Sequence, residues 1–83
     1  MYNHYDQEEL VAIKILINSY QRINIYLNAV SLIENDVFMV SGDRCIDGKS
    51  LMSIFHLNIL KPVVVYNIPV GYVEEFKDLL IQS

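Results

Sequence analysis

Ser50 is the side chain of this sequence whose position best suits a chemical role. It follows the turn signal Asp47-Gly48 and precedes an apolar segment with helical spacing, so its hydroxyl is placed to cap a helix. A phosphate at a helix start meets unpaired backbone N–H groups and the positive end of the helix dipole. Lys49 adds a neighbouring positive charge. The pattern therefore leaves two interpretations open, a plain helix cap and a site of regulatory phosphorylation.

The other groups that could act as nucleophiles or metal ligands are isolated. His4 precedes the first expected strand and His56 falls on the polar side of an expected helix, so we expect both to be solvated surface residues. Cys45 lies in a short apolar strand with no histidine close to it in sequence, which favours a buried structural thiol. The scattered carboxylates show no spacing typical of a metal site or an acid–base pair. We therefore predict no catalytic residue, no metal and no cofactor.

The elements around Ser50 follow from the periodicity of the apolar residues. Alternation over residues 10–17 predicts a half-buried strand, and Ser19 with Asn18 offers a cap for a helix reaching residue 33. Residues 37–46 predict a hairpin that turns at Gly42, followed by a helix from Ser50 to about Asn58. A strand over residues 63–66 and a last helix over residues 72–82 complete the chain. The expected buried stripe of that last helix is Val73, Phe76, Leu79 and Leu80.

The order β-α-β-β-α-β-α predicts an α+β fold in which three helices pack in two layers with a four-stranded sheet. This order admits both a ferredoxin-like sheet and other arrangements. With 83 residues we expect a single domain, residues 10–83, after a flexible segment, residues 1–9.

Composition excludes several classes of function. The net charge of −4 and the scattered cations argue against nucleic acid as a partner. No apolar run approaches the length that spans a membrane, and the first residues do not resemble a signal peptide. The lone Cys45 cannot form an intramolecular disulfide, which favours a cytoplasmic location.

Residues 36–65 resemble the second half of HPr, the small phosphocarrier protein of the bacterial sugar phosphotransferase system. The segment Asp47-Gly48-Lys49-Ser50-Leu51-Met52 is similar to the regulatory-site motif of that family, and Gly42 falls in its hairpin. The resemblance implies an open-faced β-sandwich, a four-stranded antiparallel sheet with three helices on one face. It also implies that Ser50 is the regulatory phosphorylation site.

The histidine of the family is missing from the expected place. HPr carries its phosphorylated histidine where the first strand meets the first helix, in a Gly-Leu-His-Ala-Arg-Pro motif. Residues 17–22 of this chain read Ile-Asn-Ser-Tyr-Gln-Arg instead. Phosphoenolpyruvate-driven transfer needs an imidazole nitrogen as nucleophile, so the chain is identified as a degenerate HPr-like protein.

The expected function is accordingly non-enzymatic, a regulatory or protein-binding role. Phosphotransferase-system enzymes, the HPr kinase or a regulator are the partners that the resemblance implies. Arg22, Arg44 and Lys49 are candidate contacts to a partner or a phosphate. Two alternatives stay open: an active phosphocarrier with an unrecognised acceptor, and a structural or assembly module that keeps only the fold.

Apolar residues outside the expected core predict an interaction surface. Ile25, Ala29 and Leu32 lie outside the main stripe of the first helix. In an open-faced sandwich one sheet face has no helices on it, and Leu16 would lie there with either Val64 and Tyr66 or Val63 and Val65. Exposed apolar patches often mark partner surfaces, so we expect a protein-binding face and a possible homodimer through the open sheet face.

Overall fold

The fold is built on four strands, two α-helices and one 3-10 helix. The computed structural model describes residues 9–81. In chain order the elements are β1 (Leu10–Ile15), α1 (Tyr20–Val30), β2 (Phe38–Ser41), β3 (Arg44–Asp47), α2 (Leu51–Ile54), β4 (Val63–Pro69) and η2 (Val70–Phe76). His4 and all of the predicted flexible segment except Glu9 lie outside the described residues. The carbonyl of Glu9 accepts a hydrogen bond from the backbone N–H of Val70 at 2.9 Å.

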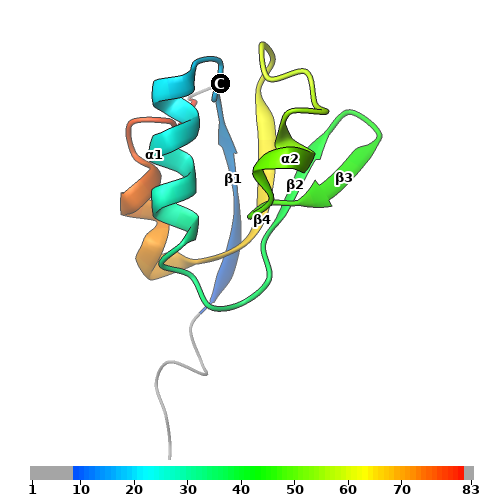
Figure 1. Ribbon diagram of the computed structural model, residues 1–83. Helices are drawn as coiled ribbons and strands as arrows, with labels where there is room; N and C mark the ends of the chain where they lie inside the picture. Colours follow the sequence, from blue (N-terminus) through cyan, green and yellow to red (C-terminus); the bar gives the residue numbers. More distant parts are fainter. Residues whose placement is uncertain (1–8, 82–83) are drawn as a thin grey trace, which may run out of the picture.

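The strands form one antiparallel sheet with the order β1-β4-β2-β3. The helices lie on one side of it, α1 and η2 over β1 and α2 over β2 and β3 (Figure 1). The predicted open-faced α+β sandwich is therefore confirmed. A bulge interrupts the pairing of β1 with β4 between Val11 and Ile13, and Asn67 in β4 takes a positive φ of 71° there.

The core lies between this sheet and the helices, and its residues come from every layer. Ile13, Ile15 and Ile17 are buried while Ala12 and Lys14 are exposed, as the alternation predicted. Tyr26 of α1 packs against Phe76 of η2 with ring centroids 6.0 Å apart. The other buried side chains are Ile23, Ala29, Val30, Ile33, Val37, Met39, Ile54, Leu57, Val63, Val65, Ile68 and Leu79. Ala29 was predicted outside this core and is 4% exposed, because η2 packs on the flank of α1.

The hairpin turns through Gly42 and Asp43, since Ser41 pairs directly with Arg44. Gly42 has a φ of 61° at the first central position, a conformation that glycine adopts without strain. The predicted turn is thus confirmed.

The helix after Ser50 is much shorter than predicted. It ends at Ile54 rather than near Asn58. His56 and Leu57 donate instead to carbonyls three residues back, at 3.0 Å each, which tightens the chain so that Ile54 and Leu57 are both buried. The side chain of Asn58 accepts from the backbone N–H of Leu60 at 3.1 Å and starts a turn there.

The predicted last helix is also wrong in its second half. The 3-10 helix η2 ends at Phe76, and residues 79–81 run along the free edge of β1. Leu16 donates to the carbonyl of Leu79, and Ile81 to that of Lys14, at 3.0 Å each. Backbone groups at a sheet edge need partners, and the end of the chain supplies them. Leu79 is consequently buried, whereas Leu80, predicted in the same stripe, is 38% exposed.

Candidate partner-binding site

The junction between β1 and α1 is where the HPr resemblance places the phosphorylated histidine. Ser19 caps α1 in an extended conformation, and its Oγ accepts a hydrogen bond from the backbone N–H of Arg22 at 3.2 Å. Asn18 and Tyr20 flank the cap. No imidazole, thiol or carboxylate lies in this stretch of the chain.

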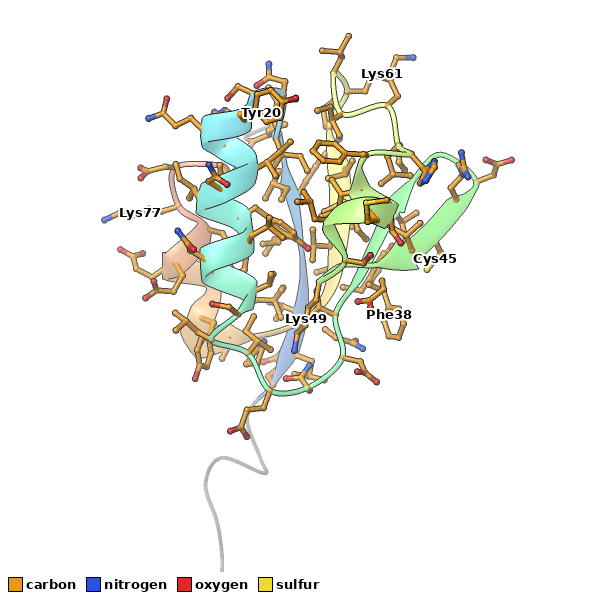
Figure 2. All side chains as sticks on the ribbon, in the orientation of Figure 1. Tyr20, Phe38, Cys45, Lys49, Lys61 and Lys77 are labelled. Atoms are coloured by element: carbon orange, nitrogen blue, oxygen red, sulfur yellow. The ribbon has the colours of Figure 1, made fainter. Side chains whose placement is uncertain are left out.

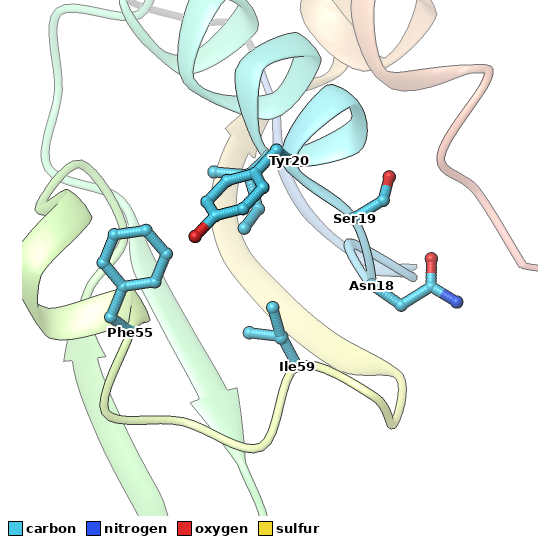
Figure 3. A pocket seen from close by; sticks show the side chains of 6 residues that line it. Asn18, Ser19, Tyr20, Phe55 and Ile59 are labelled. Atoms are coloured by element: carbon cyan, nitrogen blue, oxygen red, sulfur yellow. The ribbon is translucent and has the colours of Figure 1, made fainter.

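An open, mostly apolar cavity of about 340 Å³ adjoins this junction. Its lining residues are Asn18, Ser19, Tyr20, Ile23, Phe55 and Ile59. The rings of Tyr20 and Phe55 meet edge to face with centroids 6.3 Å apart. Figure 3 shows these two rings facing each other with Ile59 beside them, while the polar ends of Asn18 and Ser19 point away.

The side chains at this cavity are unusually accessible for their type. Tyr20 is 76% exposed and Phe55 is 48% exposed. Met52 and Leu60, at 73% and 75%, are also exposed in α2 and the loop that follows it. Such a surface can bind apolar or aromatic side chains of another protein, and the lining contains no imidazole.

The three cations predicted as phosphate contacts each bind a different backbone carbonyl. Arg22 Nη1 donates to Asp78 O at 2.9 Å, at the end of the chain. Arg44 Nη1 donates to His56 O at 3.2 Å, just after α2. Lys49 Nζ donates to Ile33 O after α1, and Figure 2 shows it between that helix end and the sheet. The structure does not bring these cations together around one acceptor.

Ser50 is the N-cap of α2, as predicted. Its Oγ accepts from the backbone N–H of Ser53 at 3.2 Å, and the residue is partly buried. Just before it, Asp47 Oδ1 accepts from the backbone N–H of Lys49 at 2.9 Å. The hydroxyl is thus engaged in the helix start. Lys49 precedes it in sequence, but the Lys49 ammonium group is bound to Ile33 O.

Cys45 and His56 are both exposed. The predicted burial of Cys45 is wrong: its register opposite Val40 places it on the sheet face without helices (Figure 2). His56 is at the surface as predicted, in a turn rather than within a helix. Among residues 9–81 no cluster of three or more His, Cys, Asp or Glu side chains could hold a metal ion. No helix in that part of the chain is long and apolar enough to cross a membrane.

Sequence reasoning missed the pairing of Tyr20 with Phe55. Phe55 is the C-cap of α2 and keeps helical backbone angles, yet its ring is exposed and meets Tyr20, while the neighbouring Ile54 is the buried residue. The available signal was Tyr20 itself, an aromatic residue directly after a helix cap and outside the apolar stripe of α1.

Comparison with known proteins supports the fold and leaves the function open. No protein-family model matches the chain, and no curated protein matches it significantly. Among solved structures it is similar to the crystal structure of HPr-C-His from Thermoanaerobacter tengcongensis, with a TM-score of 0.66 and 15% sequence identity. The match covers 87% of this chain and 90% of that chain. The fold is therefore HPr-like rather than ferredoxin-like.

Proposed function

We propose that this protein is a non-catalytic HPr-like module that binds other proteins and does not act as a phosphocarrier. The observation that supports this most is the β1–α1 junction. Where HPr places its histidine, this chain places Ser19 and Tyr20 beside an apolar cavity. We place this role in the cytoplasm, where a lone thiol such as Cys45 stays reduced.

The chemistry of the junction disfavours a phosphocarrier. Imidazole nitrogen is a nucleophile near neutral pH, whereas serine and tyrosine hydroxyls need a base to activate them. No base lines the cavity among the described residues. The nearest arginine in sequence, Arg22, is directed to the carbonyl of Asp78.

The same cavity suits recognition of a protein. Aromatic side chains dominate the binding energy of many interfaces, particularly where they border a pocket that a partner side chain fills. Tyr20 and Phe55 form such a border. The partners that we propose are phosphotransferase-system enzymes, the HPr kinase or a regulator that recognises this fold.

Binding can be tested with Tyr20→Ser and Phe55→Ser. Calorimetric titration of the general phosphotransferase enzyme and of HPr kinase into the protein should give binding that each variant weakens at least about tenfold. Tyr66→Ser is the matched control, because Tyr66 is 45% exposed on the open sheet face. Equal binding by all variants would place the partner elsewhere, and no binding to either enzyme would favour a structural module with the fold alone.

Regulation through Ser50 is a second proposal, supported by its place at the start of α2. The phosphate would replace the hydroxyl that accepts from Ser53 and would lie close in sequence to Asp47. The phosphate and the Asp47 carboxylate would repel each other. Because the phosphate also attracts cations, we expect a phosphoserine to draw the Lys49 ammonium group away from Ile33 O.

Intact-mass measurement separates these proposals from an active phosphocarrier. The protein is incubated with phosphoenolpyruvate and the general phosphotransferase enzyme, and separately with ATP and HPr kinase. We expect no mass gain in the first reaction, where an ordinary HPr serves as positive control. A gain of one phosphate there would show an unrecognised acceptor. A gain only with ATP, lost in Ser50→Ala, would support regulation at Ser50.

A further inference from the structure

The open face of the sheet carries an ordered set of side chains that no element of the described chain covers. Register places Lys14, Val64, Val40 and Cys45 in one row across all four strands. Tyr66, Phe38 and Asp47 form the next row across β4, β2 and β3. This settles which of the two alternatives lies on the open face: Val64 and Tyr66 do, while Val63 and Val65 are buried.

The centre of this face is apolar and its two edges have opposite charges. Tyr66 and Phe38 are 45% and 41% exposed, which is high for neighbouring aromatic residues on a sheet. Lys14 is exposed at the β1 edge and has no ion-pair partner among residues 9–81. Asp47 stands at the β3 edge, with one carboxylate oxygen bound to the backbone N–H of Lys49.

We propose that two copies of this chain form a homodimer by stacking their open sheet faces. A two-fold axis parallel to the strands, along the line between β4 and β2, places β1 of each copy over β3 of the other. At the centre, β4 of each copy then lies over β2 of the other, so that Val64 faces Val40 and Tyr66 faces Phe38 of the other copy. Lys14 of each copy lies one row from Asp47 of the other, so both charges gain an opposite partner.

The charge pattern is what selects a second copy as the occupant. An isologous interface must be complementary to itself, and a cation at one edge with an anion at the other satisfies that condition under the two-fold rotation. The net charge of −4 opposes self-association at every face, so the opposite charges at the two edges of this face are needed to offset that repulsion. This inference rests on the open face alone and is independent of the function proposed for the cavity beside Tyr20.

The size of the face sets the expected affinity. Four strands about 4.8 Å apart and roughly 20 Å long cover on the order of 300 Å² per copy. Stable complexes bury about 800 Å² per partner, so the dimer should be weak and in rapid exchange. We expect association that becomes visible only at protein concentrations of roughly 0.1 mM and above.

Sedimentation equilibrium over a wide concentration range tests the dimer directly. The average mass should rise above the monomer value of 9.6 kDa as concentration increases. Tyr66→Lys should raise the dimer dissociation constant at least about tenfold, because it buries a charge at the centre of the interface. Gln21→Lys introduces the same charge at an exposed position of α1, on the helical side of the molecule, and should leave association unchanged.

Charge exchange tests the orientation without relying on a disruptive variant. Lys14→Asp and Asp47→Lys should each weaken the dimer, while the double variant should restore much of the affinity. Circular dichroism would confirm that each variant is folded. Failure of the double variant to recover any association would overturn the proposed orientation.

A cross-link gives an independent readout of the same geometry. In the proposed dimer, positions 14 and 45 of different copies face each other because both belong to one row. With oxidised glutathione as oxidant, Lys14→Cys should form an intermolecular disulfide to the native Cys45, whereas Lys77→Cys, whose side chain is 64% exposed, should not. A monomer at every concentration, or equal cross-linking of both variants, would overturn the proposal.

Discussion

The hydroxyl of Tyr26 donates a 2.7 Å hydrogen bond to the carbonyl oxygen of Gly48. Tyr26 is fully buried on α1, and Gly48 lies in the turn that leads to Ser50. The bond therefore ties the first helix to the segment that starts the second. It also satisfies a hydroxyl and a carbonyl that would otherwise be unpaired in the core.

Tyr26→Phe should lower the stability of the fold. The change keeps the ring and its contact with Phe76 but leaves the carbonyl of the buried Gly48 without this donor. An unsatisfied buried acceptor costs about 1–3 kcal/mol. Urea denaturation should show this loss, whereas Tyr20→Phe, at a side chain 76% exposed, should change the free energy of unfolding by less than about 0.5 kcal/mol.

The same tyrosine should make stability depend on alkaline pH. Burial, and to a smaller extent the charge of Asp47, raise the pKa of Tyr26 above its ordinary value of 10.0. The unfolded chain loses this proton near pH 10 while the folded chain keeps it, so folding stability is fully present below pH 10 and falls as pH rises further. Denaturation midpoints measured above pH 10 should decline less steeply for Tyr26→Phe. Parallel profiles for the two proteins would contradict this.

Gly48→Ala should destabilise the protein because the space beside Gly48 is filled. A Cβ atom there would lie 2.8 Å from the Tyr26 hydroxyl oxygen and 2.9 Å from Val37 Cγ1. We expect a loss of about 1–3 kcal/mol in free energy of unfolding. The loss should be smaller in a Tyr26→Phe background, where one of the clashing atoms is gone.

Gly42→Ala is the matched comparison for that coupling. No atom lies within 4 Å of a Cβ built on Gly42, but its φ of 61° is costly for alanine, by roughly 1–2 kcal/mol. This cost should simply add to that of Tyr26→Phe. A loss for Gly48→Ala that also adds in full would argue against contact with Tyr26.

The sequence predicted features that depend on neighbouring residues. The caps at Ser19 and Ser50, the turn at Gly42 and the buried face of β1 all rest on short patterns with a direct physical cause. The sequence likewise shows that residues 17–22 contain no histidine, and the resemblance to HPr predicted the fold that the structure has.

The features that the sequence did not reveal depend on tertiary contacts. Cys45 resembles a core residue by type, and only the strand register assigns it to the uncovered face. Phe55 is apolar and follows the buried Ile54, and only the tertiary structure shows that its exposed ring meets Tyr20. The candidate site therefore needed the structure, because it joins two segments that are distant in sequence.

Leu79 and Leu80 provide a direct test of how the chain ends. A helix over residues 72–82 would bury both, whereas pairing with β1 buries only Leu79. Leu79→Ala should lower the free energy of unfolding by about 2–5 kcal/mol. Leu80→Ala should lower it by less than about 1 kcal/mol. Equal effects of the two substitutions would contradict the edge pairing.

Ser50 variants can separate the helix cap from the regulatory site. Ser50→Ala removes the acceptor of the Ser53 N–H and should cost about 1 kcal/mol in the free energy of unfolding. Ser50→Asp should keep the cap, because aspartate caps helices as well as serine and its charge suits the helix start, so stability should change by less than about 0.5 kcal/mol. Denaturation of the three proteins under one condition measures both effects.

If Ser50→Asp is folded and equally stable but binds partners differently, the added charge acts on recognition rather than on folding. If it is as unstable as Ser50→Ala, the proximity of Asp47 outweighs the cap, and a phosphate at Ser50 would unfold the start of α2.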